Sequence, residues 1–140
     1  NIVPVSISYE YDPCDSLKAN ELYAKATEGA YEKSEYEDIA SIVKGITGQK
    51  GHVHVAFGDP IEADFDTPEA LAEEIDRQII SNYYLHSSNL LAAGQGDDAS
   101  DSEKQGLEAR LNSTVNGAED ILRQMYANPV INQKRMQESS

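Results

Sequence analysis

The sequence predicts a mixed α/β fold (α/β or α+β) with two strands and four to five mostly amphipathic helices. Residues 1–10 and 51–61 alternate apolar with small or polar residues, a period of two that is typical of strands with one buried face. Elsewhere, apolar residues recur every three or four positions between capping residues and glycines, which predicts helices. Because helices separate the strands, we expect a crossover or a pairing of distant strands rather than a hairpin.

The first strand begins directly at the start of the chain. One of its faces carries Val3, Val5 and Ile7, and the other carries Pro4, Ser6 and Ser8. We expect the β-branched face to be buried within a sheet. Two strands alone are marginally stable, and a typical sheet has about five strands. We therefore expect further strands upstream, so that this chain is the C-terminal part of a larger domain.

Two helices are expected between the strands. The first covers residues 16–27 and ends at Gly29. The second begins at a capping box, in which Ser34 precedes Glu37 by three positions, and it ends at Gly48. Both have an apolar stripe that predicts packing on one side.

The second half of the sequence predicts two long helices. One runs from the capping segment 66–69 to near Gly94, and the other covers residues 102–126. Pro129 predicts an interruption and a frayed tail, because proline removes a helical hydrogen bond. The polar, acidic segment between the helices is typical of a flexible linker. The predicted divisions are 1–93, 94–101 and 102–140.

Charge limits the choice of partners. The chain has 25 acidic and 11 basic residues and a formal net charge of −14. This charge repels phosphate backbones and anionic lipids, so we expect no nucleic-acid partner and no direct membrane contact by this chain. No apolar run approaches the roughly 20 residues that cross a bilayer. The single cysteine, Cys14, excludes an internal disulfide, and its acidic neighbours favour an ordinary thiol over a nucleophile.

His54 and Asp59 have the His-x-x-x-x-Asp spacing of a general-base pair in glycerolipid acyltransferases. Such a pair needs the residues between them to turn a helix. Here an extended strand would hold the two side chains about 15 Å apart, too far for a hydrogen bond. We interpret the match as a coincidence and assign no catalytic residue.

The other polar residues predict no complete site. His52 and His54 share one strand face and could bind a metal, but only Asp59 and Glu62 lie near enough in sequence to help, so a polar strand face is favoured. His86 is expected on a helix, packed or facing water. The acid pairs Glu73-Glu74 and Asp97-Asp98 are expected at a solvated surface. We therefore predict no metal and no cofactor.

Several segments, in order along the chain, are similar to one enzyme family. They are residues 2–10, 17–22, 33–45, 51–61 and 67–92, which include Ile2-Val-Pro-Val-Ser-Ile-Ser-Tyr-Glu10 and the Gly58-Asp-Pro-Ile61 ending of the second strand. The first segment resembles the last of four sequence blocks in the glycerol-3-phosphate and lysophosphatidate acyltransferase family, and the whole resemblance, to bacterial members above all, covers about residues 1–93. Residues 94–140 have no resemblance of this kind.

The resemblance implies the C-terminal part of an acyltransferase of phospholipid synthesis. Such an enzyme moves a fatty acyl group from acyl-CoA or acyl carrier protein to glycerol-3-phosphate or lysophosphatidate, and it would be cytoplasmic and peripheral at the membrane. The family's catalytic His and Asp, its phosphate-binding Arg block and its Glu-Gly-Thr-Arg block precede the strand block, so the chain alone is expected to be inactive. Val3, Pro4 and Val5 are candidate walls of the substrate site, although simple packing in the sheet is an equally good interpretation.

A second interpretation comes from a different functional class. The chain could be a non-enzymatic interaction module, in which the acidic surface recruits a basic partner and the amphipathic helices self-associate. Either interpretation predicts an association through the exposed sheet edge or the apolar helix faces, with a missing N-terminal half of the domain or with a second copy.

Overall fold

The protein is described here by a computed structural model over residues 1–34 and 36–139. Within these ranges it has helices and one two-stranded antiparallel sheet, which confirms the mixed fold class. The elements in chain order are β1 (Val5–Tyr9), α1 (Asp15–Glu28), α2 (Glu37–Thr47), β2 (Val53–Phe57), α3 (Pro68–Asn82), α4 (Ser87–Ala92), α5 (Asp101–Asn112) and α6 (Glu119–Glu138).

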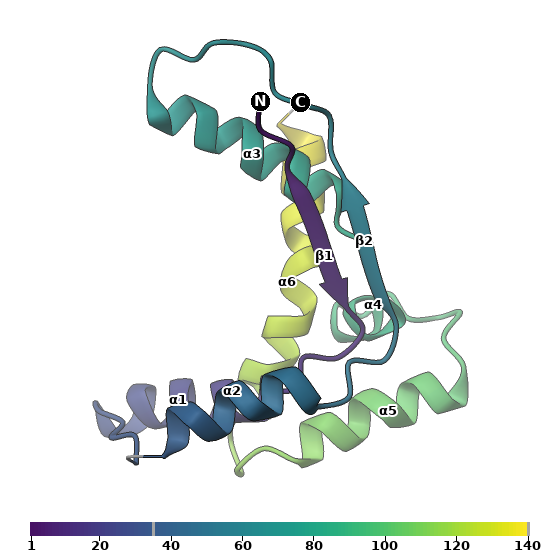
Figure 1. Ribbon diagram of the computed structural model, residues 1–140. Helices are drawn as coiled ribbons and strands as arrows, with labels where there is room; N and C mark the ends of the chain where they lie inside the picture. Colours follow the sequence, from purple (N-terminus) through teal and green to yellow (C-terminus); the bar gives the residue numbers. More distant parts are fainter. Residues whose placement is uncertain (35, 140) are drawn as a thin grey trace.

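The apolar core lies among the helices and not beneath the sheet. Its buried residues are Ala19, Ala92, Leu107, Leu111, Ala118, Leu122, Tyr126, Ala127 and Val130. α6 is central, because it packs against α1, α3, α4 and α5. Figure 1 shows β1 in front of α6 and β2 to its right, with α1, α2 and α5 at the lower end of the strands.

The two strands pair as distant segments, as predicted. β1 and β2 run antiparallel, with Ile7 opposite Val55 and Ser8 opposite His54. An isolated bridge between Ile2 and Ile61 extends the pairing beyond the strand ends. The long connection through α1 and α2 therefore returns the chain to the same sheet.

The two faces of this sheet are reversed relative to the prediction. The outer face consists of apolar side chains that are 36–75% exposed, namely Val3, Val5, Ile7, Tyr9, Val53, Val55 and Phe57. The inner face carries Ser6 and Ser8, which are only 3% and 1% exposed. The expectation that the β-branched face is buried is therefore wrong for this chain.

The physical reason is that α3 and α4 bring polar groups to the strands. The Ser88 hydroxyl donates a 2.6 Å hydrogen bond to the carbonyl of Glu10. The side-chain oxygen of Gln78, itself buried, accepts a 2.8 Å hydrogen bond from the backbone N–H of Asp59. Such groups find partners on the backbone just beyond the ends of β1 and β2, so the face with small serine side chains lies against them.

The third predicted helix is two helices. α3 begins as expected, with Pro68 in its first turn and the Thr67 hydroxyl accepting a hydrogen bond from the N–H of Ala70. It ends at Asn82, and α4 begins only after His86, whose N–H donates a 2.9 Å hydrogen bond to the side chain of Asn89. This local cap starts a new helix where the apolar stripe alone predicts continuity.

The last predicted helix is also two helices. α5 ends at Asn112, and a turn containing Gly117, with φ of 99°, precedes α6. α6 then continues through Pro129 to Glu138, so the predicted interruption and the frayed tail up to residue 139 are wrong. Buried Ala127 and Val130 on either side of the proline hold the helix against the core. Ser140 lies outside the described residues.

α1 and α2 end where the sequence predicts. Gly29 closes α1 in the left-handed conformation, with φ of 77°, and Gly48 closes α2. The apolar side of α2 is uncovered: its large side chains, 53–73% exposed, are Tyr36, Ile39, Ile42, Val43 and Ile46. The loop before α1 contacts this helix, because the Cys14 thiol donates to the carbonyl of Ser41 and Pro13 lies against Gly48.

Candidate functional site

The inner face of the sheet carries a cluster of imidazole and phenol rings. Tyr84, in the break between α3 and α4, is at its centre. Its ring centroid lies 4.8 Å from those of His54 and His86 and 5.7 Å from that of His52. The His54 ring is stacked on Tyr84, whereas His86 meets it edge-on. The break between the helices therefore brings His86 and Tyr84 to His52 and His54, which neighbour each other on β2 and are about 30 positions earlier in the sequence.

A groove of about 180 Å³ lies beside this ring cluster. His52, Tyr84 and His86 form part of its wall, together with the carboxylates of Glu10 and Glu103. Both carboxylates already have hydrogen-bond donors: Glu10 accepts from the N–H of His52 at 2.8 Å, and Glu103 accepts from the Ser87 hydroxyl at 2.7 Å. The hydrogen bonds from Ser87 and then Ser100 lower the pKa of the Glu103 carboxyl.

His86 is the buried member of the cluster. His86 is only 4% exposed, and its Nε2 atom lies 3.2 Å from the carbonyl oxygen of Ser8. A carbonyl can only accept, so Nε2 carries the proton in this contact. Burial lowers the pKa of His86, and the neighbouring His52 and His54 lower it further, while the Ser8 contact opposes the shift. Burial therefore disfavours the charged form of this ring relative to an exposed histidine.

The arrangement does not assemble an acid–base pair. In the parts of the chain that the structure describes, no histidine forms an ion pair with a carboxylate, and no group of three metal-ligating side chains is present. His54 lies within β2 and Asp59 lies beyond its end, as predicted when their spacing was interpreted as a coincidence. His86 precedes α4, so its predicted position on a helix is wrong.

Three buried polar atoms of the inner face lack a hydrogen-bond partner. They are Ser6 Oγ, Ser8 Oγ and His54 Nδ1. Ser8 and His54 are directly opposite each other across the strands. A buried polar group without a partner costs about 1–3 kcal/mol, so these three atoms make the inner face less stable than a fully hydrogen-bonded arrangement would be.

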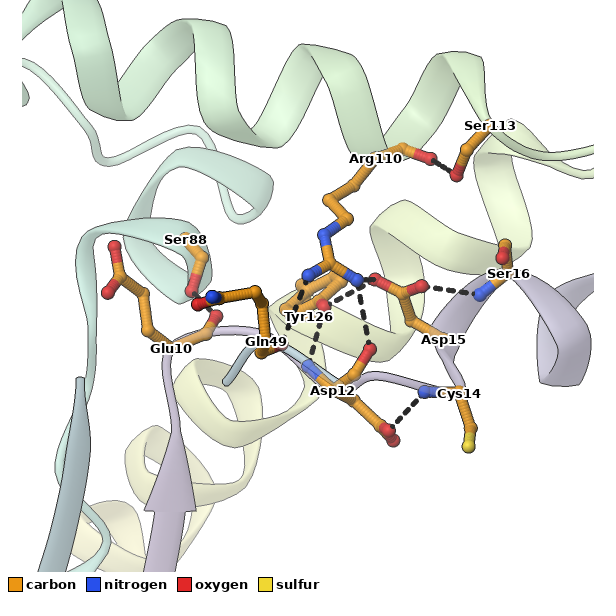
Figure 2. A network of polar contacts seen from close by, with 10 residues as sticks. All are labelled: Glu10, Asp12, Cys14, Asp15, Ser16, Gln49, Ser88, Arg110, Ser113 and Tyr126. Carbon is orange, nitrogen blue, oxygen red and sulfur yellow. Dashed lines mark hydrogen bonds and ion pairs between the residues drawn. The ribbon is translucent and has the colours of Figure 1, made fainter. Parts of the chain in front are cut away.

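A second polar cluster joins the loop after β1 to α5 and α6 (Figure 2). The Tyr126 hydroxyl donates a 2.6 Å hydrogen bond to Asp15 Oδ2, and it accepts one of 3.0 Å from the N–H of Asp12. Arg110 lies 3.3 Å from the same Asp15 oxygen and also donates to the carbonyls of Asp12 and Gln49. Burial, and then the hydrogen bond with Asp15, raises the pKa of Tyr126.

Beside this polar cluster is a pocket of about 170 Å³, which we call the edge pocket. Its walls are apolar or aromatic and come from Ile7, Tyr9, Tyr83, Met125 and Pro129. Asp12, Asp15, Asn89 and Tyr126 line its polar part. Because Ile7 and Tyr9 belong to the outer face of the sheet, the edge pocket adjoins that uncovered apolar surface.

The structure separates the candidate substrate-wall residues. Val3 and Val5 lie on the exposed outer face, whereas Pro4 is buried on the opposite side. The edge pocket is lined instead by Ile7 and Tyr9, further along the same strand. A role of Val3, Pro4 or Val5 in binding substrate stays a prediction.

The structure also locates Cys14 and the two acid pairs singled out in the sequence. Cys14 is partly buried at the N-terminal end of α1, hydrogen bonded to Ser41. Of the acid pairs, Asp97 and Asp98 are exposed, while Glu74 forms a 2.6 Å ion pair with Arg77 that helps to lower the pKa of its carboxyl to about 2. These groups do not extend either polar cluster.

Neither polar cluster could be read from spacing. Asp15 and Tyr126 are 111 positions apart, and Asp15 and Arg110 are 95 apart. The cap formed by His86 and Asn89 is the local signal that could have placed Tyr84 and His86 outside a helix.

No protein-family model, curated protein or solved structure matches this chain. Across residues 1–34 and 36–139, no helix combines the length and the hydropathy needed to cross a membrane.

Proposed function

We propose that this chain is the C-terminal part of an acyltransferase domain that esterifies glycerol-3-phosphate or lysophosphatidate from acyl-CoA or acyl carrier protein. In this proposal the chain supplies a structural platform and no catalytic residue. The whole enzyme works in phospholipid synthesis, peripherally at the cytoplasmic face of the membrane. The observation that supports a partial domain most directly is the uncovered apolar outer face of the sheet.

The outer face has the composition of a buried surface. Every outward-facing position of residues 3–9 and 53–57 carries an apolar side chain, although the chain as a whole has a net charge of −14. Fully burying a Val, Ile or Phe side chain contributes about 1.5–3 kcal/mol. A covering layer over the outer face would therefore add several kcal/mol of stability, which favours a cover of protein over permanent exposure to water.

The backbone at the edges of the sheet supports the same proposal. The N–H of Glu10 donates to the carbonyl of His52, and the N–H of Gly58 donates to the carbonyl of Pro4, so the even-numbered residues are the hydrogen-bonded positions between the strands. Paired and unpaired positions alternate along an antiparallel ladder. The backbone groups of Ile7 and Val55, at unpaired positions, therefore point to the outer edges, where further strands could pair with them.

The particular enzyme class rests on the resemblance of residues 1–93 to the acyltransferase family. That family's catalytic His and Asp belong to sequence blocks that come before the strand block. The side chains of His52, His54 and His86 contact Tyr84 and one another, and none forms an ion pair with a carboxylate of residues 1–34 and 36–139. This agrees with a chain that depends on another segment for its chemistry.

A second candidate is a non-enzymatic interaction module. The exposed apolar side of α2 favours it, because that helix presents large side chains away from both the sheet and the helical core. An apolar helix face on an acidic protein suits a partner with an apolar groove and basic residues around it.

Acyl transfer by defined polypeptides separates the two candidates. We would read the coding sequence upstream of Asn1, express any encoded segment together with this chain, and follow transfer of a labelled acyl group to glycerol-3-phosphate. The proposal expects no product from the 140 residues alone and product from the joined polypeptide. An upstream segment with no His-x-x-x-x-Asp sequence, or a joined polypeptide without activity on either acceptor, would contradict it.

Two matched variants make the test specific. Substituting Ala for the upstream histidine should abolish transfer, whereas His54→Ala in the same polypeptide should keep measurable transfer, because His54 is stacked on Tyr84 and not paired with an acid. Loss of transfer in both variants, with folding retained, would place His54 in the catalytic site and overturn the assignment.

A further inference from the structure

α2 contacts the rest of the molecule through the side that carries its smallest residues. The Ser41 carbonyl accepts a 3.4 Å hydrogen bond from the Cys14 thiol, and Gly45 lies next to the same sulfur. Gly48, which follows the helix, lies against Pro13. Positions 41, 45 and 48 share one side of the helix because they are three or four residues apart. This side faces the loop before α1.

The opposite side of α2 is apolar and uncovered. Its large side chains, which are 53–73% exposed, are Tyr36, Ile39, Ile42, Val43 and Ile46. None of residues 37–47 is buried in the structure. An amphipathic helix of a globular protein normally turns its apolar stripe toward the core. α2 turns this stripe away from the chain instead, at the lower end of the strands in Figure 1, so the stripe is available to another polypeptide.

The apolar side of α2 has the spacing of a seam between two helices. Its residues at intervals of three, four and three positions, the a and d pattern of paired helices, are Tyr36, Ile39, Val43 and Ile46. Exposed Ala40 borders this seam on one side, and Ile42 borders it on the other. A small residue at the border lets a second helix approach closely. The pattern therefore favours a helix as the partner.

The charge around α2 favours a helix from a second copy of this chain. Residues 33–50 contain three lysines, at positions 33, 44 and 50, and three acids, at positions 35, 37 and 38. This segment therefore has no net charge, although the whole chain has −14. Two copies repel each other only weakly at such a segment. A partner with a basic rim would meet lysines as well as acids there.

The order of the charges along α2 favours an antiparallel pair. Glu37 and Asp38 lie in the first turn of the helix, and Lys44 lies in the last turn. In an antiparallel pair, the acidic turn of each helix is level with the lysine of the other, whereas a parallel pair aligns like charges. Asp38 already pairs with Lys33 and stays 72% exposed. Exposed charges contribute little binding energy, so they set the orientation while the apolar seam supplies the affinity.

We infer that α2 pairs antiparallel with α2 of a second copy of this chain. Ile39 of each helix packs against Val43 of the other, and Tyr36 packs against Ile46. Helices of about 16 Å bury less than the roughly 1,200 Å² of a standard interface. The pair is therefore weak, with a dissociation constant on the order of 0.1–1 mM. The inference goes beyond the proposed function and does not rest on it, because the outer face of the sheet takes no part.

Dilution of the 140-residue chain tests the pairing. Amide chemical shifts are followed by NMR from about 2 mM to about 0.02 mM, a range that spans the expected dissociation constant. We expect saturable changes at residues 36–47. Val43→Lys should weaken the association about tenfold or more, because its charge would be buried in the seam. Gln105→Lys, which adds the same charge on exposed α5, should leave the association unchanged.

The amide spectrum outside α2 shows whether Val43→Lys keeps the fold, which we expect because Val43 is 53% exposed. Shifts at residues 36–47 that do not depend on concentration would overturn the inference and leave a different partner as the occupant of α2.

Phe57→Lys separates α2 from the outer face of the sheet. Phe57 belongs to that face, so this variant should keep the concentration-dependent changes at residues 36–47. If Phe57→Lys and Val43→Lys both abolish these changes, then α2 packs on the sheet of the second copy and the inference fails.

Cysteine cross-linking tests the orientation. In a Cys14→Ser background, one chain carries Tyr36→Cys and a second, isotope-labelled chain carries Ile46→Cys, at the two ends of the apolar seam. Antiparallel pairing brings position 36 of one copy to position 46 of the other. After mixing and oxidation, disulfides between the two variants should therefore exceed those within either variant about fivefold. An excess of disulfides within one variant would indicate parallel helices and overturn the inference.

Discussion

The Tyr126 hydroxyl donates a 2.6 Å hydrogen bond to the buried carboxylate of Asp15, and this contact joins the start of α1 to the middle of α6. The Asp15 side chain is 2% exposed. A charged acceptor at this depth depends on its donors, because water cannot replace them. The contact therefore ties the loop that follows the sheet to the helical core.

Tyr126→Phe tests the energy of this contact. Removing the hydroxyl leaves Asp15 with one fewer donor and the N–H of Asp12 without its acceptor. We expect the free energy of unfolding to fall by about 1–3 kcal/mol, measured by urea denaturation. The exposed Tyr36→Phe change is the matched control and should alter stability by less than about 0.5 kcal/mol. An equal effect of the two changes would contradict the role of the Tyr126 hydroxyl.

The histidine cluster predicts a dependence of stability on pH. His86 has a lowered pKa in the folded protein because of its burial, with His52 and His54 adding to the effect. As the pH falls through the ordinary histidine pKa of about 6.5, His86 is protonated in the unfolded chain before it is protonated in the folded chain. We therefore expect the free energy of unfolding to decrease as the pH is lowered from about 7.5 to about 5.5, a window that spans the ordinary histidine pKa.

His86→Gln isolates this contribution, because glutamine can still donate to the Ser8 carbonyl but does not titrate. Its loss of stability over the same pH window should be smaller than that of the unsubstituted protein. The other titratable groups that face His86 are Glu10, His52, His54, Tyr84 and Glu103. A control change at exposed His52, to Gln, should keep most of the pH dependence. Identical pH profiles for the protein and for His86→Gln would refute the assignment.

The uncovered outer face predicts self-association of the isolated chain. Phe57 is its most exposed member, at 75%. We expect concentration-dependent mass in light scattering and binding of a hydrophobic dye, and both should decrease in Phe57→Lys. The free energy of unfolding should change by less than about 0.5 kcal/mol, because Phe57 packs little in the monomer.

Gln105→Lys, on the exposed side of α5, is the control for added charge. It should leave the association and the dye binding as they are. If both lysine variants reduce association equally, then net charge and not the outer face governs it.

The positions of the strands and the beginnings of several helices could be predicted from local chemistry. Thr67 caps α3 and Gly29 closes α1, because capping hydrogen bonds and left-handed backbone depend on neighbouring residues alone. The alternation in β1 correctly groups the residues that share a face. It does not say which face is covered, since that depends on what α3 and α4 present to the sheet.

The breaks between helices were harder to predict for a related reason. The apolar stripe from Leu71 to Leu90 continues through the break at Tyr83 because the side chains on both sides still pack, although the backbone changes direction. The Asp15–Arg110–Tyr126 cluster depends on three elements meeting in space, and no sequence interval records that meeting. Both candidate sites thus arise from tertiary structure.

Every buried apolar residue of the core lies in a helix or, like Ala118, caps one. None of them lies in a strand of the described chain. The packing of the helices therefore uses no apolar side chain of the two-stranded ribbon formed by β1 and β2. A newly added neighbour could dock on the ribbon without disturbing the packing around Leu122, so assembly with another polypeptide would require little reorganisation of what is already folded.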